Sequence, residues 1–260
     1  MATAKRRVLV TGASSGIGAA TARLLDSRGF EVIATARRMD RLNEMAAGTG
    51  ITVRHLDVTD HDEIRELAAE LAPAGIDAVV NIAGGATDAS SVEDADPESW
   101  RKMFEINVIG VQQVIHHFLP LLRESSSRHG FADILAVSST AGFVAYETGG
   151  GYNVAKFGVR ALLEVLRLEL AGEPIRVIDI APGMVKTDEF ALGRFGGDQS
   201  KVDALYAGVE HPLTADDVAG VIVNSLELPG HVNLDRVVVR PVAQAAQHKL
   251  HRGPLTPKER

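Results

Sequence analysis

The sequence predicts an α/β fold: one doubly wound domain with seven parallel strands and helices on both faces of the sheet. Short, nearly continuous apolar segments alternate with longer helix-like segments, which is typical of parallel strands buried on both faces. The first apolar segment, residues 8–10, leads straight into a glycine-rich turn and a helix-like run. The length of 260 residues fits one large core, so no second structural domain is expected.

Composition excludes several functions. The net charge is -7 at pH 7, so no basic surface is expected to attract nucleic acid or anionic lipid. The chain has no cysteine, which excludes disulfides, thiolate metal ligands and a cysteine nucleophile, and no metal site is expected. The apolar run after residues 5–7 is too short for the core of a signal peptide, and no segment is long enough to span a membrane. We therefore expect a cytoplasmic protein.

A phosphate-binding turn is predicted after the first strand. The turn, residues 11–18, reads TGASSGIG and precedes a helix-like run that ends at Gly29. Gly12, Gly16 and Gly18 lack the Cβ atoms that would prevent a tight turn and keep a diphosphate at a distance. The start of the following helix faces the anion with backbone N–H groups and the positive end of its dipole. This context predicts a dinucleotide-binding site.

The residues after the second predicted strand, 30–36, indicate which cofactor binds. Proteins that bind NAD(H) place an acidic residue there for the ribose hydroxyls, whereas those that bind NADP(H) place an arginine there for the 2′-phosphate. This chain has Arg37 and Arg38 at that place, and the next acidic residue is Asp40. We predict NADP(H) over NAD(H). The alternative is that both arginines only solvate the start of a helix.

Further strands and helices alternate toward the C-terminus. In chain order we expect strands at 51–56, 76–82, 131–137, 175–180 and 234–240, and helices at 62–71, 97–122, 154–170 and 214–226. The run NIAGG places residues 81–85 at the carboxyl end of a strand, where ligands bind in such sheets. The helices at 97–122 and 154–170 are apolar on more than one side, which predicts a homodimer or, in preference, a homotetramer.

A candidate acid–base pair lies in the run GYNVAK, residues 151–156. Tyr152 and Lys156 are four positions apart in a helix-like segment, so they share one helix face. An ammonium one turn from a phenol favours the phenolate, which lowers the pKa of the tyrosine toward neutrality. The glycines at 149–151 are expected to give the preceding loop freedom. The alternative is a Tyr–Lys pair on a solvated helix.

Three further regions have expected roles. Asn107 is a poor helix former among aliphatic residues, so its amide is expected either to hold the core together or to position a water near the chemistry. The segment at about 187–212 is mixed in character and contains several glycines, which fits a mobile lid over the substrate. We expect a catalytic domain at 1–240 and a polar C-terminal tail at 241–260 that frays or lies on a neighbouring subunit.

Together these motifs resemble the short-chain dehydrogenase/reductase family over essentially the whole chain. TGASSGIG is similar to the family's cofactor loop, NIAG to its motif on the fourth strand, and PGMVKT to its nicotinamide-side loop. The residues similar to the family's catalytic tetrad are Asn107, Ser139, Tyr152 and Lys156. Ser139 is preferred to Ser138 because it precedes Tyr152 by thirteen positions, as the family spacing implies. Two departures from the family pattern, at Ile82 and at residues 154–155, leave the reacting groups in place.

The resemblance implies a single-domain Rossmann-type fold and reversible hydride transfer between NADP(H) and a carbonyl compound or secondary alcohol. In the family's chemistry, Ser139 and Tyr152 bind the carbonyl oxygen and Tyr152 supplies a proton. Lys156 holds the nicotinamide ribose, and Asn107 supports a water that relays protons. The cofactor-binding residues predicted in this way are Gly12, Ser14, Ser15, Gly16, Ile17, Gly18, Arg37, Arg38, Asp57, Val58, Asn81, Ala83, Gly84, Tyr152, Lys156, Pro182, Gly183, Val185 and Thr187.

The last third of the chain is similar to one branch of the family, the NADP-dependent 3-hydroxy acid dehydrogenases that accept serine or allo-threonine. This similarity implies that Arg194 pairs with a substrate carboxylate beside Ser139 and Tyr152. The alternative is that Arg194 is a solvated lid residue. Two other functions stay open: a ketone, ketoacyl or secondary-metabolite carbonyl reductase without a carboxylate requirement, and a nucleotide-sensing regulator. The regulator is disfavoured because it would lose the reacting groups, which are intact here.

Overall fold

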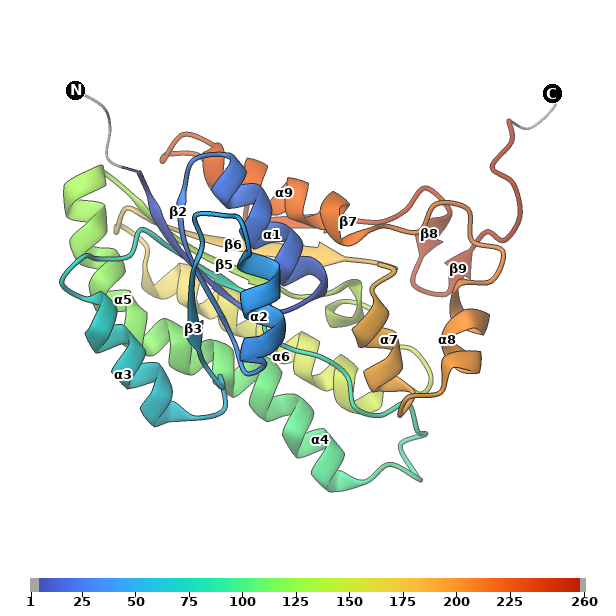
Figure 1. Ribbon diagram of the computed structural model, residues 1–260. Helices are drawn as coiled ribbons and strands as arrows, with labels where there is room; N and C mark the ends of the chain where they lie inside the picture. Colours follow the sequence, from blue (N-terminus) through green and yellow to red (C-terminus); the bar gives the residue numbers. More distant parts are fainter. Residues whose placement is uncertain (1–4, 258–260) are drawn as a thin grey trace.

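Seven parallel strands form one sheet in the computed structural model, which describes residues 5–257 (Figure 1). Residues 1–4 of the expected catalytic domain and 258–260 of the expected tail lie outside the described residues. The strand order is β3-β2-β1-β4-β5-β6-β7, and every neighbouring pair is parallel. The strands are β1 (Arg7–Thr11), β2 (Glu31–Ala36), β3 (Thr52–His55), β4 (Ala78–Asn81), β5 (Ala132–Val137), β6 (Ile175–Pro182) and β7 (Arg236–Val239). The predicted fold class is confirmed.

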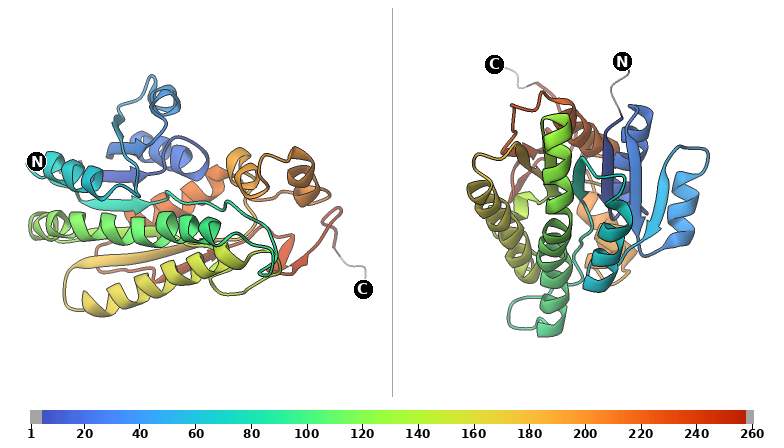
Figure 2. Two further views of the ribbon diagram at one scale, coloured as in Figure 1. Left: turned by 90° about the horizontal axis from the view of Figure 1, so that it is seen from below. Right: turned by 90° about the vertical axis from the view of Figure 1, so that its left-hand side faces the viewer.

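The five central strands, β2, β1, β4, β5 and β6, send alternate side chains into two separate cores, because successive side chains of a strand point to opposite faces of the sheet. In β1, Val8 and Val10 belong to one core and Leu9 to the other. The first core includes side chains of α1 (Gly16–Ser27), α2 (Met39–Ala46) and α9 (Ala215–Glu227). The second includes side chains of α3 (His61–Leu71), α5 (Gly110–His129) and α6 (Gly150–Glu169). Helices therefore cover both faces (Figures 1 and 2). No helix within residues 5–257 has the length and apolarity needed to cross a membrane.

The helix expected at 97–122 is longer than predicted and is interrupted. It consists of α4 (Pro97–Phe104), a π-helical turn (Glu105–Ile109) and α5 (Gly110–His129). The side chain of Asp96 caps its start, and Gly130 follows its end with a left-handed φ of 84°. Asn107 lies within the π turn and is buried. Turns of this kind are frequent at functional sites.

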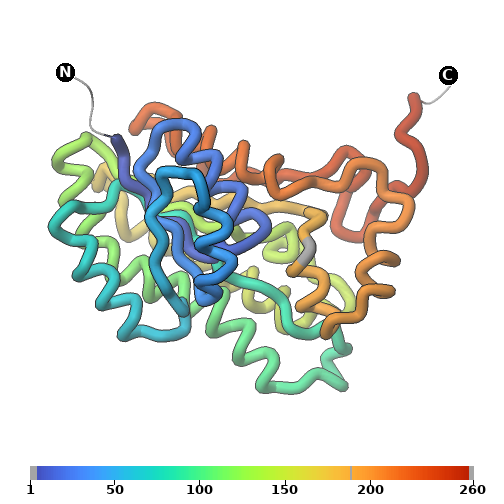
Figure 3. The backbone as a smooth tube through the Cα atoms, in the orientation of Figure 1, coloured from blue at the N-terminus to red at the C-terminus, as the bar shows by residue number. Residues whose placement is uncertain are grey.

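The carboxyl ends of the strands meet at one end of the molecule. The chain leaves β1 for β2 and β3 on one side and returns to β4 on the other side of β1. In sheets of this topology, ligands bind in the crevice at this switch point. α7 (Asp188–Arg194), α8 (Gln199–Tyr206), β8 (Gln244–Ala246) and β9 (Lys249–Leu250) gather at the same end, as the backbone trace in Figure 3 shows.

Residues 241–257, where the sequence predicts a polar tail, contain a short hairpin of β8 and β9 near the strand ends. β8 pairs antiparallel with β9, and Val209, just after α8, forms a bridge with Gly253. The Arg252 guanidinium donates hydrogen bonds to the carbonyl oxygens of Leu205, at 3.3 Å, and Ala207. The described part of this segment therefore packs on α8 of the same chain.

Candidate active site

One cleft of about 700 Å³ runs along the carboxyl ends of the strands, from the glycine turn to the C-terminal hairpin. It brings together nearly all of the predicted site residues. Those that line it are Gly12, Ser14, Ser15, Gly16, Ile17, Gly18, Arg37, Arg38, Asp57, Val58, Ala83, Gly84, Ser139, Tyr152, Lys156, Pro182, Gly183, Val185, Thr187 and Arg194. Asn81 and Asn107 do not line it.

The glycine turn is shaped by close backbone contacts. Gly12 has a φ of +69°, and a Cβ atom there would lie 2.7 Å from the backbone nitrogen of Ala83. A Cβ atom on Gly18 would lie 2.2 Å from the carbonyl oxygen of Gly12. The Thr11 hydroxyl accepts hydrogen bonds from the backbone N–H groups of Ile82 and Ala83, both at 3.1 Å. These contacts hold the turn after β1 against the end of β4 and leave its backbone open toward the cleft.

Arginines stand at the end of the cleft next to this turn. The Arg38 guanidinium donates to the Ser14 hydroxyl at 3.0 Å and to the Ser15 hydroxyl at 3.2 Å. It also forms a two-bond ion pair with Glu189 of α7, at 2.8 and 2.6 Å. Arg41 pairs with the same carboxylate. Arg37 instead lies 3.7 Å from the carboxylate of Asp57 at the end of β3.

Tyr152 and Lys156 lie on the first two turns of α6, and each is only 7% exposed. This helix begins at Gly150, so two of the three glycines expected to loosen the preceding loop are helical instead. They are needed for packing, since a Cβ atom on Gly150 would lie 2.5 Å from the Trp100 ring. The start of α6 therefore packs closely against α4.

The prediction that Lys156 lowers the pKa of Tyr152 is wrong for this structure. Burial raises the pKa of Tyr152, and the Ser139 hydroxyl opposes the rise only in part. Burial also lowers the pKa of Lys156 to about 8. The ammonium donates a 3.1 Å hydrogen bond to the carbonyl oxygen of Val137 and lies 5.7 Å from the centroid of the tyrosine ring. Tyr152 is consequently a protonated phenol at neutral pH, which suits a proton donor.

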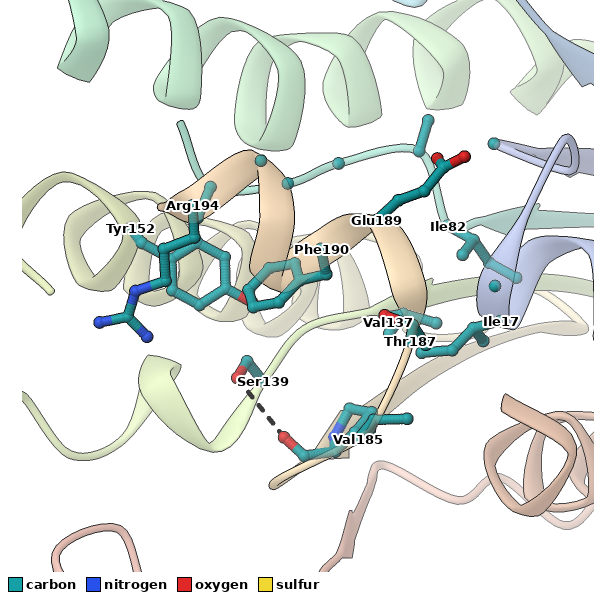
Figure 4. A pocket seen from close by; sticks show the side chains of 18 of the residues that line it. Ile17, Ile82, Val137, Ser139, Tyr152, Val185, Thr187, Glu189, Phe190 and Arg194 are labelled. Carbon is teal, nitrogen blue, oxygen red and sulfur yellow. Dashed lines mark hydrogen bonds between the residues drawn. The ribbon is translucent and has the colours of Figure 1, made fainter. Parts of the chain in front are cut away.

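The two serines after β5 face different surroundings. Ser139 lines the cleft, where its hydroxyl accepts from the Ala141 N–H at 3.1 Å and lies 3.4 Å from the Pro182 carbonyl oxygen (Figure 4). Ser138 is buried and bonds to the carboxylate of Asp179. Only Ser139 therefore has a hydroxyl available to a molecule in the cleft.

The two predicted asparagines act behind the cleft. The Asn107 amide donates to the carbonyl oxygens of Gly85, at 2.9 Å, and Met103, at 2.7 Å, and accepts from the Gly85 N–H at 3.2 Å. It thereby fixes the loop after β4 beside Lys156. Asn81 is 3% exposed, and its amide donates to the Leu135 carbonyl oxygen at 3.4 Å. The structure does not bring the Asn81 side chain to the cleft, because it crosses to the neighbouring strand.

The other end of the cleft is aromatic and contains one cation. Phe190 of α7 packs edge-on against the Tyr152 ring, with 5.3 Å between centroids. The Arg194 guanidinium lies 5.1 Å from the centroid of the Tyr146 ring, and its buried Nε has no hydrogen-bond partner among residues 5–257. Figure 4 shows Glu189 and Arg194 pointing from α7 toward opposite ends of the cleft. One short helix thus contributes to both ends.

Comparison with known proteins agrees with this geometry. The model of the family described as short chain dehydrogenase matches residues 6–192. The chain belongs to the short-chain dehydrogenase/reductase family. It is 46% identical over 253 residues to an uncharacterized oxidoreductase of Mycobacterium tuberculosis, covering 97% of this chain and 98% of that protein. It is 40% identical over 244 residues to sulfoacetaldehyde reductase 2 of Chromohalobacter salexigens, covering 92% and 95%.

Among solved structures, the closed form of serine dehydrogenase complexed with NADP+ superposes on this short-chain dehydrogenase/reductase with a TM-score of 0.86. The two chains are 33% identical, and the match covers 97% of this chain and all of the other. The predicted resemblance to the serine and 3-hydroxy acid dehydrogenase branch of the family is confirmed.

Sequence reasoning missed several residues of this short-chain dehydrogenase/reductase site, and five of them bear on its chemistry. Arg41 and Glu189 complete the charged cluster, Tyr146 lies beside Arg194, and Gln244 and Gln247 reach the cleft from the C-terminal hairpin. Arg41 had a signal, since it lies one helical turn after the predicted Arg37 and Arg38. The two glutamines had none, because a polar segment with prolines is typical of a tail.

Proposed function

We propose that this enzyme transfers a hydride between NADP(H) and the carbonyl carbon of a small compound, or the corresponding secondary alcohol. The observation that carries the proposal is the meeting of Ser139, Tyr152 and Lys156 in one cleft with the Arg38 cluster at its far end. A sensing regulator would not need the three reacting groups. The serine dehydrogenase complexed with NADP+ supports the choice of cofactor.

The residues present fit a dinucleotide with a 2′-phosphate. Cβ atoms on Gly12 and Gly18 would collide with neighbouring backbone, so these glycines permit the tight turn whose backbone N–H groups can face a diphosphate. Arg38, with the hydroxyls of Ser14 and Ser15, would hold the 2′-phosphate. When bound, NADPH supplies the hydride. Lys156 would hold the nicotinamide ribose near Tyr152.

The side chains of the cleft suggest how the proton moves. Ser139 and Tyr152 would donate hydrogen bonds to the carbonyl oxygen, and Tyr152 would give it a proton as the alcohol forms. The charge of Lys156 would stabilise the phenolate that remains. Asn107 would position the loop at Gly85, and a water relay behind Lys156 completes the proposed path. We further propose that residues 187–212 form a lid on the catalytic domain, residues 1–240.

The pKa of Lys156 predicts how reduction depends on pH. Burial lowers this pKa from 10.5 to about 8, so the ammonium is charged below pH 8 and loses its proton above it. The kcat of carbonyl reduction should therefore be level below about pH 8 and fall roughly tenfold per pH unit above it. Steady-state kcat with saturating NADPH from pH 6 to pH 10 measures this. A level profile up to pH 10 would show that the Lys156 charge plays no part.

We propose that the substrate carries an acidic group that pairs with Arg194. The buried Nε of Arg194 lacks a partner among the described residues, and an unsatisfied buried donor calls for an acceptor. Serine carries a carboxylate and sulfoacetaldehyde a sulfonate, and both proteins named for these compounds are similar to this chain. Either group offers a guanidinium two oxygens.

Replacing Arg194 with alanine should raise the KM for acidic substrates about tenfold to a hundredfold, since a charge-assisted hydrogen bond is worth roughly 1.5–3 kcal/mol. The KM for neutral ketones should stay unchanged. Arg65→Ala, which removes an exposed arginine of α3 away from the cleft, serves as the matched control. Initial rates with both substrate classes decide the matter. If Arg194→Ala leaves the KM for every acidic substrate unchanged, the proposed pairing of Arg194 with an acidic group is wrong.

A second candidate is a ketone or ketoacyl reductase that needs no acidic group. The apolar part of the cleft lining, which includes Met103, Ile106, Phe190 and Leu205, favours it. A panel of carbonyl compounds and alcohols, followed by NADPH absorbance, separates the two. The panel should contain serine, other 3-hydroxy acids, sulfonated aldehydes and neutral ketones. Activity confined to neutral ketones would favour the second candidate, and no activity with any compound would contradict both.

We also propose that a second subunit covers an exposed apolar face of α4 and α6, giving a homodimer or, in preference, a homotetramer. Phe104 is 40% exposed, and Val154, Val165 and Leu168 are 50%, 51% and 77% exposed. The last three return to one face of α6, because eleven residues make about three helical turns. Light scattering should give the mass of two or four chains, and Leu168→Glu should shift it downward. A monomeric wild-type protein would contradict the assembly.

A further inference from the structure

The Glu189 carboxylate accepts hydrogen bonds from the arginine cluster, Arg38 and Arg41. Glu189 accepts from Nη1 and Nη2 of Arg38 at 2.8 and 2.6 Å and from the Ser15 hydroxyl at 2.8 Å. Arg41 pairs with it as well. Four donor groups from the glycine turn and the start of α2 therefore converge on a residue of α7 that lies between 148 and 174 positions away in the sequence.

This carboxylate is charged at neutral pH. Burial alone would raise the pKa of Glu189, but the hydrogen bonds from Arg38 and Ser15 and the charges of Arg38 and Arg41 lower it overall. The Glu189 side chain is 34% exposed, so it is not locked in the interior. A bidentate Arg–carboxylate pair of this kind has the same donor geometry that a phosphate group uses.

We propose that Glu189 is a specificity-determining residue for the cofactor: it competes with the 2′-phosphate for Arg38, Arg41 and Ser15. This inference rests on the proposed NADP(H) function. A 2′-phosphate carries about −1.5 to −2 charges and needs the same N–H and O–H donors. Two anions at one arginine cluster repel each other, so the phosphate binds only when Glu189 moves away.

The competition affects only one form of the cofactor. NAD(H) has a hydroxyl where NADP(H) has the phosphate, so it does not need the donors that Glu189 holds. Glu189 therefore weakens the binding of phosphorylated cofactor and leaves that of NAD(H) nearly unaltered. Glu189 thus reduces the preference for NADP(H) over NAD(H) below the preference that the arginines would give without it.

Isothermal titration calorimetry with adenosine 2′,5′-bisphosphate and adenosine 5′-monophosphate tests the inference. Glu189→Gln keeps the shape of the side chain and removes its charge. It should bind the bisphosphate about fivefold to tenfold more tightly than the wild type, and the monophosphate within about twofold. Glu70→Gln is the matched control, because it makes the same change at a half-exposed glutamate of α3 that pairs with Arg54 and does not line the cleft. It should bind both ligands as the wild type does.

Equal or weaker binding of the bisphosphate by Glu189→Gln overturns the inference. Weaker binding would mean that Glu189 orients the arginines, and a parallel loss for the monophosphate would mean that it contacts the ribose. Thermal unfolding shows whether each variant is folded. The proposed function can fail separately. If Glu189→Gln binds the bisphosphate more tightly, but the wild-type protein oxidises NADPH in the presence of none of the carbonyl compounds tested, the inference is supported and the proposed function is rejected.

Discussion

Tyr152→Phe should lower kcat by about 10² to 10⁴, the usual contribution of a positioned proton donor. The expected loss follows from the burial of the phenol, whose raised pKa keeps it protonated at neutral pH. Because the cofactor's phosphates would lie at the glycine turn, the Kd for NADPH should change less than about twofold. Single-turnover rates and NADPH fluorescence titration measure the two quantities separately.

The matched control is Tyr206→Phe. Its hydroxyl donates to the Val185 carbonyl oxygen at 2.8 Å, so its loss should affect the lid more than the chemistry and lower kcat less than about tenfold. If Tyr152→Phe keeps near-normal turnover, or if Tyr206→Phe loses as much as Tyr152→Phe, the assignment of Tyr152 as the proton donor is wrong.

Arg38→Ala should raise the Kd for NADPH about tenfold to a hundredfold and leave the Kd for NADH nearly unchanged, since charge-assisted hydrogen bonds are worth roughly 1.5–3 kcal/mol. We expect this loss of NADPH affinity for Arg38 because, of the two predicted arginines, it bonds to the hydroxyls of the glycine turn, whereas Arg37 faces Asp57. Fluorescence titration with both cofactors gives the two constants.

Arg54→Ala is a suitable control for this measurement. Arg54 is a half-exposed arginine of β3 that pairs with Glu70, away from the cleft. Arg54→Ala should leave the Kd for NADPH and the Kd for NADH unchanged. Equal weakening of NADPH and NADH by Arg38→Ala would show that Arg38 supports the turn and does not select the phosphate.

The fold and the reacting groups could be predicted because their signals are local. Val8 to Val10 are apolar on both faces, as a central parallel strand requires, and the turn that follows has glycines where the backbone approaches itself most closely. Tyr152 and Lys156 are one helical turn apart, so their placement on one face follows from helix geometry. The choice of Ser139 over Ser138 depended on the family spacing. Both serines border the cleft, but the Ser138 hydroxyl is bonded to the Asp179 carboxylate, which leaves the Ser139 hydroxyl as the available one.

What could not be predicted depends on contacts between distant parts of the chain. Glu189 meets Arg38 and Arg41 through the position of α7, which no local pattern specifies. Gln247 meets Thr140, at 2.7 Å, because the last described residues fold back on the strand ends. The pKa of Tyr152 was predicted with the wrong sign because proximity to a cation in sequence says nothing of burial or of where the ammonium points.

Transfer of deuterium from NADPH labelled at nicotinamide C4 tests the central claim most directly. The wild-type enzyme is incubated with the labelled cofactor and the carbonyl panel, and the alcohols formed are analysed by mass spectrometry. We expect one deuterium on the carbinol carbon from one of the two C4-labelled epimers and none from the other, with the signal lost in Tyr152→Phe. Unlabelled alcohol from both epimers, or no alcohol from any carbonyl compound, would contradict direct hydride transfer by this enzyme.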